Sequence, residues 1–496
     1  MSVCKFPLHH DSSGGGGGFG LLLLLVPVGL AAYGVRVLWP YLVLAADVAR
    51  IAVPAAAVLA LAFASVRFAR ATPAARRNYP RAWLARLRWR WLMRNLGLAK
   101  VDQHARDKAA ASAGKGRRPP IHHPRVRIRA THHGLVASVK TVPGSGRAEF
   151  EKAAGHIADE WGCTRVQVSQ PRPGRLIVRG LVTDPLAAKF GPEGAPAGTY
   201  EHPDVTRPYL GLSEFAEHRH LSLRGQTGIV IGGQPGRGKS SLIGSLLCQW
   251  GPSPVVQLAA ADGKGSADME DWHPRMWLHA DDDLEAAVSL LEDCHALMRA
   301  RLGCVVQVTG AKNSWHVGPT EAWPLVVVIL DECQQYLDVA SYKGDKEREA
   351  LSRRCVALTA ELIRKGRSAM FVTVLATQKP TTDSIPSTCS ANAGISLCFG
   401  VKTIEAAAAV LGPDIREYGS VSPVGLRDDS MVGVLTSTLP TGQDPFTRVR
   451  VPGFTEAEIA ERASASAHLR RDPRASLPDV TAADTVPDTV AELLTA

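Results

Sequence analysis

One short stretch has the residue types and spacing that hold the phosphates of a nucleotide. It runs Gly233, Gln234, Pro235, Gly236, Arg237, Gly238, Lys239, Ser240 and Ser241. Glycines let a backbone come close to phosphate, and the N–H groups of such a loop and of the helix after it point at the anion. Lys239 is expected to reach the β- and γ-phosphates, and the Ser240 hydroxyl is expected to coordinate Mg²⁺. The stretch therefore predicts an ATP site.

Two acidic residues at the end of an apolar run offer the chemistry of hydrolysis. Residues 325–330 are Leu, Val, Val, Val, Ile and Leu, and Asp331 and Glu332 follow. Such a run predicts a parallel strand that is buried on both faces. Ligands of open α/β folds bind at the carboxyl ends of such strands. We expect Asp331 to hold the Mg²⁺ and Glu332 to polarise the attacking water as a general base.

A second apolar run, residues 370–376, ends in Thr377 and Gln378. A polar amide there can sense the γ-phosphate or orient the attacking water. The alternative is a solvated strand end with no catalytic part. Beside the other two motifs, Gln378 favours ATP hydrolysis.

The flanking sequence predicts the elements that position these residues. Residues 228–231 form a short apolar strand pattern that leads into the glycine-rich stretch. An amphipathic helix pattern follows it, with apolar residues at Leu242, Ile243, Leu246, Leu247 and Trp250. Further strands are expected at 395–399 and 431–435. The fold class is therefore α/β, a RecA-like P-loop core whose parallel sheet is flanked by helices.

A chain of 496 residues is too long for a single core. The composition predicts a flexible N-terminus, a two-span transmembrane hairpin, a basic juxtamembrane helix with a linker, a small α+β module, the P-loop ATPase motor and a C-terminal helix with a mobile tail. Their expected limits are 1–18, 19–66, 67–120, 121–200, 201–455 and 456–496.

The N-terminal region predicts a membrane anchor. Residues 12–35 contain no charged side chain, and neither do residues 51–66. A cleaved signal peptide is the competing interpretation of the first stretch, but Lys5 is the only cation before it. Arginines gather just after residue 66, which predicts a multi-pass protein of the cell membrane with a cytoplasmic ATPase domain. Residues 79–91 mix arginine with tryptophan, which suits a helix at the headgroup boundary or, alternatively, stacking on nucleic-acid bases.

The charge balance is basic, with 57 Lys and Arg against 47 Asp and Glu. Residues 67–118 carry much of the excess and only two acids, Asp102 and Asp107. The nine cysteines form no C-x-x-C pair, which indicates reduced thiols and argues against a disulfide-stapled secreted protein.

The motor segment resembles the FtsK/SpoIIIE family of DNA-pumping ATPases. The resemblance runs from about residue 211 to 411 and is carried by the motifs at 233–240, 261–265, 325–332, 362–369 and 375–380. The chain is most similar to the actinomycete (Streptomyces-type) conjugative transfer proteins. It differs from chromosome-segregating members in having a shorter linker and no evident winged helix. The resemblance implies a homo-hexameric ring around double-stranded DNA, with largely sequence-independent phosphate contacts and ATP sites between subunits.

A ring motor needs a cation that one subunit supplies to the site of its neighbour. Arg299, Arg301, Arg364 and Arg367 are candidates, although a surface role is the default for each. We rank Arg301 and Arg367 first.

Together these features predict a membrane-anchored, ATP-driven translocase of double-stranded DNA for conjugative transfer. The alternatives are a segregation motor at the division septum, the ATPase of a protein secretion system, and a recruitment platform whose ATPase only controls assembly.

Overall fold

The computed structural model describes residues 68–101, 121–265, 267–440 and 445–478, together with isolated residues between 50 and 66. Contacts divide the chain into two units, 1–76 and 77–496. The second unit contains both of the larger sheets. The expected linker from 103 to 120 and the end of the expected tail, 479–496, lie outside the described residues.

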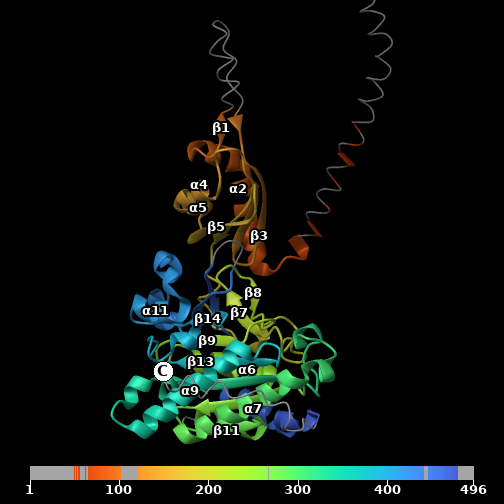
Figure 1. The fold of residues 1–496 in the computed structure, drawn as a ribbon. Coiled ribbons are helices and arrows are strands. Elements are labelled where there is room, and N and C mark those ends of the chain that lie inside the picture. The colour runs from red at the N-terminus through yellow and green to blue at the C-terminus, as the bar shows by residue number, and fades with distance from the viewer. Residues whose placement is uncertain are drawn as a thin grey trace, which may run out of the picture. The chain divides into compact units, whose positions relative to one another are not determined.

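A large mixed sheet forms the centre of the motor part of the second unit (Figure 1). Its strand order is β11-β10-β12-β13-β9-β14-β15-β16-β7-β8. The strands from β11 to β14 are parallel, and the rest of the sheet is antiparallel. The parallel strands are β9 (Gly228–Gly232), β10 (Val256–Asp262), β11 (Leu278–Ala280), β12 (Leu325–Asp331), β13 (Phe371–Thr377) and β14 (Ile395–Cys398). The antiparallel strands are β7 (Tyr209–Ser213), β8 (His218–His220), β15 (Val434–Ser437) and β16 (Thr447–Arg450).

Two hydrophobic cores lie on opposite faces of this sheet. Alternate side chains of β9 enter different cores: Ile229 and Ile231 pack with α6, and Val230 packs with α7 and α9. This alternation follows from the strand period of two, and burial on both faces explains the continuous apolar runs in the sequence. The helices are α6 (Lys239–Trp250), α7 (Leu284–Thr309), α8 (Gln334–Leu337), α9 (Lys346–Lys365), α10 (Ser387–Ser390), α11 (Ile404–Leu411) and α12 (Glu456–Ser466).

A separate four-stranded antiparallel sheet with the order β3-β4-β6-β5 forms the expected small α+β module. Its strands are β3 (Arg125–Thr131), β4 (Gly134–Lys140), β5 (Arg165–Arg172) and β6 (Arg175–Leu181), and its helices are α2 (Pro73–Asn95), α4 (Arg147–Lys152) and α5 (Ala154–Trp161). Side chains of α2, α4 and α5 share one core with one face of the sheet. A two-stranded pair, β1 (Lys100–Val101) with β2 (Ile121–His122), stands beside it.

Helix α2 corrects the interpretation of the arginine–tryptophan segment. Trp89, Leu92 and Met93 are buried in the core of the module, and the Trp89 indole donates a hydrogen bond of 2.7 Å to the Pro124 carbonyl. Only the other side of the helix, with Trp83 and Trp91, is exposed. The segment is thus an integral layer of the module.

The expected membrane anchor also needs correction. None of the helices in the described part of the chain combines the length and the apolarity that crossing a bilayer requires. This finding contradicts the expectation of a multi-pass membrane protein. The first expected span and most of the second lie outside the described residues.

The start of the expected mobile tail contacts the motor. Arg471 forms a 3.0 Å ion pair with Glu321, and Arg474 forms one of 3.0 Å with Asp293. Residues 470–478 therefore extend the motor's surface.

Candidate active site

Strand register brings the three predicted motifs to one edge of the large sheet. Gly232 of β9 is the partner of Thr377 of β13, and Leu330 of β12 is the partner of Leu375. Strand β13 therefore lies between the strand that leads into the glycine-rich loop and the strand that ends in Asp331. The loop, the acidic pair and Gln378 all follow the carboxyl ends of these strands, where ligands of such sheets bind.

The loop has the backbone conformation that its glycines permit. Gly236 and Gly238 have φ angles of +71° and +111°, a region that other residues rarely adopt. A Cβ on Gly238 would also lie 2.9 Å from the Cα of Gly433. Helix α6 begins directly after Gly238, so its free N–H groups face the loop. This is a cradle for an anion.

Lys239 links the loop to both acidic residues. Its Nζ lies 2.8 Å from Asp331 Oδ1 and also contacts Glu332 Oε1. All three residues are at most 4% exposed. Burial lowers the pKa of Lys239, but the Asp331 and Glu332 carboxylates outweigh it and raise the pKa above its usual value. The lysine therefore remains charged.

Glu332 is held by more than the lysine. Its backbone has a φ angle of +47°, and its N–H donates to Asp331 Oδ1 at 2.9 Å. Its Oε2 accepts hydrogen bonds from Gln334 Nε2 at 2.8 Å and from the Gln378 backbone N–H at 3.1 Å. Burial raises the pKa of Glu332, but hydrogen bonds from Lys239 and Gln334 outweigh it, so the pKa is lowered. A left-handed backbone conformation is strained for a residue other than glycine, and such strain is often found at functional sites.

Two residues that the sequence analysis missed belong to this network. Thr377 Oγ1 donates a 2.6 Å hydrogen bond to Gln334 Oε1, so the end of β13 orients the amide that holds Glu332. Gln334 stands two positions after Glu332, and Thr377 precedes Gln378. Their proximity to predicted site residues was the signal available in the sequence.

Arg237 contacts a segment that no motif indicated. Its guanidinium lies 3.2 Å from Asp429 Oδ1, and its carbonyl accepts a 3.0 Å hydrogen bond from the Gly433 N–H. Residues 428–433 thereby pack against the glycine-rich loop. Ser240 and Ser241 are both exposed at the start of α6, as a role toward a ligand requires.

Arg301 is not a trans-acting cation, contrary to the ranking from sequence. It is completely buried, donates to the carbonyls of Pro324 and Ala369 at 2.8 and 2.9 Å, and lies 4.9 Å from the centre of the Trp323 ring. Burial lowers the pKa of Arg301 to about 9. A guanidinium in the core has no path to a neighbouring subunit. Arg367, by contrast, is exposed just before β13, at the opposite edge of the sheet from the loop.

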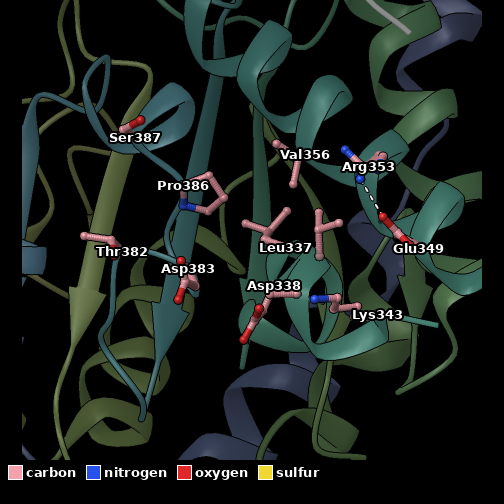
Figure 2. Close-up of a pocket in the computed structure, with 12 residues that line it drawn as sticks. Leu337, Asp338, Lys343, Glu349, Arg353, Val356, Thr382, Asp383, Pro386 and Ser387 are labelled. Atoms are coloured by element: carbon pink, nitrogen blue, oxygen red, sulfur yellow. Dashed lines mark hydrogen bonds and ion pairs between the residues drawn. The ribbon is translucent and has the colours of Figure 1, made fainter. Parts of the chain in front are cut away.

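A surface hollow of about 540 Å³ is lined by segments that follow β12 and β13, but it contains no residue of the glycine-rich loop or the acidic pair (Figure 2). Leu337 and Asp338 line it, together with Asp383 and Pro386 of the segment after β13 and Arg353 and Val356 of α9. Arg353 is engaged there with Glu349. The hollow is thus distinct from the phosphate cradle.

The residues present fit a nucleotide with its Mg²⁺. The cradle offers backbone N–H groups and an ammonium to phosphate, a serine hydroxyl and a carboxylate to the metal, and a held glutamate to water. The arrangement is that of an ATP-hydrolysing P-loop enzyme.

Comparison with known proteins returned similarities of fold. No protein-family model and no curated protein matches the chain. Among solved structures, the monomer of the pCW3 conjugation coupling protein TcpA with ATPγS shares 14% identity, with a TM-score of 0.48, over 69% of this chain and 93% of that one. The cytoplasmic domain of the type VII secretion ATPase EccC of Thermomonospora curvata shares 15% identity, with a TM-score of 0.40, over 54% of this chain and 31% of that one. The genome packaging NTPase B204 of Sulfolobus turreted icosahedral virus 2 shares 12% identity, with a TM-score of 0.26, over 46% of this chain and 98% of that one.

Proposed function

We propose that this chain is an ATP-driven translocase of double-stranded DNA of the FtsK/SpoIIIE type that serves conjugative transfer. The observation that best supports ATP hydrolysis is the contact of Lys239 with Asp331 and Glu332 at the carboxyl ends of three parallel strands. Sequence motifs on both sides of β13, at 362–369 and 375–380, support a DNA motor.

The contacts of Lys239 indicate how the site responds to nucleotide. The Lys239 ammonium is neutralised by Asp331 and Glu332. ATP phosphates would replace the carboxylates as its partners, which releases Asp331 for Mg²⁺ and Glu332 for the attacking water. The Mg²⁺ would supply charge neutralisation at the phosphates, with Ser240 and Asp331 as its protein contacts. Gln334 and the Gln378 backbone keep Glu332 oriented during this exchange.

The site also needs a cation from elsewhere to stabilise the transferred phosphoryl group. We assign this role to Arg367, because it is exposed and precedes β13. It therefore lies at the edge of the sheet opposite the glycine-rich loop of its own subunit. A homo-hexameric ring around the duplex would place it against a neighbouring ATP site. The limits expected from sequence, 121–200 for the module and 201–455 for the motor, are widened in the proposal: α2 joins the module, and residues 456–478 join the motor.

Duplex-stimulated hydrolysis tests this function. Steady-state ATP hydrolysis by the full chain should rise several-fold with linear duplex DNA, and Lys239→Ala should abolish both basal and stimulated rates. A chain that hydrolyses ATP at a rate indifferent to duplex DNA would contradict the DNA motor. Stimulation by an unfolded protein in place of DNA would favour a secretion ATPase.

A further inference from the structure

The face of the module's sheet that is not packed against helices carries a row of cations. Cross-strand register places Arg125 opposite Lys140, Lys140 opposite Arg175, and Arg175 opposite Arg172. Partners in register point to the same face of a sheet, so one positive side chain from each of four strands stands in a line. Arg127 and Arg129 extend this set along β3, because residues two apart on a strand share a face. All six residues, hereafter the cationic face, are exposed.

This row of like charges is unfavourable for the stability of the sheet. Like charges directly opposite each other destabilise a strand pair. Protection of an edge strand would explain arginines on β3, but β4 and β6 are interior strands of this sheet. Lys140 and Arg175 therefore have no protective role. An anionic ligand would remove the cost.

Several other arginines of the module have acidic partners, in contrast to these residues. Arg88 pairs with Glu160 at 3.0 Å, Arg147 with Glu151 at 2.6 Å, and Arg165 with Glu214 at 2.9 Å. Among the described residues, no salt bridge involves a member of the cationic face. Its charges are available to a ligand.

The residues around these charges limit the class of anionic ligand that the cationic face can bind. A hollow of about 750 Å³ runs over β3, β4 and β6, and its lining includes Arg125, Lys140 and Arg175 but no acidic and no aromatic residue. Without aromatic rings, the face cannot stack on the bases of a single strand. Its apolar lining residues are buried or only partly exposed, so the hollow has no side chains to insert into a lipid surface. They are Val126, Val136, Val139 and Ile177. Cations alone suit the phosphate backbone of a duplex.

We propose that the cationic face binds the backbone of double-stranded DNA and gives the chain a duplex contact outside the motor. This inference rests on the proposed DNA substrate. The spacing is suitable: cations about 4.8 Å apart across the strands and about 6.7 Å apart along β3 present a broad grid to the phosphates. Contacts of this kind hold and orient a duplex without reading its sequence.

The test is the salt dependence of duplex binding by the full chain. The variant Arg125→Gln/Lys140→Gln/Arg175→Gln removes three charges from the row. The matched control Arg90→Gln/Arg94→Gln/Lys152→Gln removes three exposed charges from helices α2 and α4 of the same module. Fluorescence anisotropy with a labelled linear duplex at several salt concentrations measures log K against log salt. We expect the row variant to lower the slope by about 2.7 and to weaken low-salt binding by roughly 10-fold or more, while the control changes the slope by less than about 1.

Each other outcome has a separate meaning. If the two triple variants bind duplex alike, and the unaltered chain binds and is stimulated by it, the inference is wrong while the proposed function stands. If the unaltered chain neither binds duplex nor is stimulated by it, the proposed function fails first. Loss of binding to anionic phospholipid vesicles, with duplex binding intact, would overturn the inference in favour of a lipid surface. Should the row variant unfold early in a thermal scan, Arg127→Gln/Arg129→Gln serves in its place, with an expected slope change of about 1.8.

Discussion

Lys239 holds two buried carboxylates at once, and this links the stability of the site to its proposed activity. Within the described part of the chain, neither Asp331 nor Glu332 has another basic side chain in contact. The lysine is thus the counter-ion that makes their burial tolerable, and the same ammonium is the group that ATP must recruit.

A stability cycle tests that dual role. Lys239→Ala should destabilise the nucleotide-free protein by about 3–5 kcal/mol near neutral pH, because it leaves two adjacent buried charges without a partner. Adding Glu332→Gln should recover part of this loss, since it removes one of the two charges. Denaturant unfolding of both single variants and the double variant measures the coupling. Additive effects would show that the three side chains do not act together.

Replacing Glu332, the proposed general base, should separate nucleotide binding from hydrolysis. Glu332→Gln keeps an oxygen for the Gln334 and Gln378 contacts but cannot accept a proton, so kcat should fall by about 10²–10⁴. Nucleotide binding should change only a few-fold. The matched control is Glu347→Gln, an exposed acid of α9, which should keep the unaltered rate. An unchanged kcat in the Glu332 variant would remove this residue from the mechanism.

At this scale the sequence indicated the groups that we propose to contact phosphate and water, but not the residues that support them. The glycine-rich loop and the acidic pair could be predicted because each is adjacent in sequence to the strand or helix that positions it. Gln334 and Thr377 support Glu332 through a contact between two strand ends, which spacing does not show. Arg301 could have been placed correctly: it shares a helical face with Leu297, Cys304 and Val305, and that face is buried.

Among the elements, α2 shows how composition misleads. Arginine and tryptophan together suggested a membrane-surface helix, but the three tryptophans of α2 do not share one face. Trp89 is 3% exposed and Trp91 is 55% exposed. The helix completes the module's core with one face, which a count of residue types cannot detect.

The two tryptophans give a paired test. Trp89→Ala should destabilise the module by about 3–5 kcal/mol because it leaves a large cavity, whereas Trp91→Ala should stay within about 0.5 kcal/mol. Hydrogen exchange of β3 and β4 reports the module separately from the motor. Equal effects of the two variants would mean that α2 does not pack as described.

The large sheet was predictable mainly in its parallel half, with the strand expected at 431–435 as the exception. Apolar runs flanked by glycine and acidic residues identified β9, β12 and β13, since strands buried on both faces need such runs. In the antiparallel extension, β15 with β16 and β7 with β8 are local pairs, but β16 with β7 joins segments more than two hundred residues apart. Pairing over that distance leaves no local pattern.

For the whole molecule, the proposed ring makes a prediction about mixtures. Lys239→Ala and Arg367→Ala subunits should each be inactive alone. Random mixing in one ring should make about a quarter of the interfaces complete, with the lysine from one subunit and the arginine from the next. Duplex-stimulated ATPase activity of the mixture measures this recovery. A mixture without recovery, although both proteins assemble, would exclude Arg367 as the trans-acting cation.

Movement along DNA is the central claim, and displacement of a triplex-forming strand from a linear duplex measures it most directly. With ATP, the full chain should displace the third strand, while Lys239→Ala and a non-hydrolysable ATP analogue should leave it bound. Duplex-stimulated hydrolysis without displacement would contradict translocation and indicate an ATPase that uses DNA only as an activator.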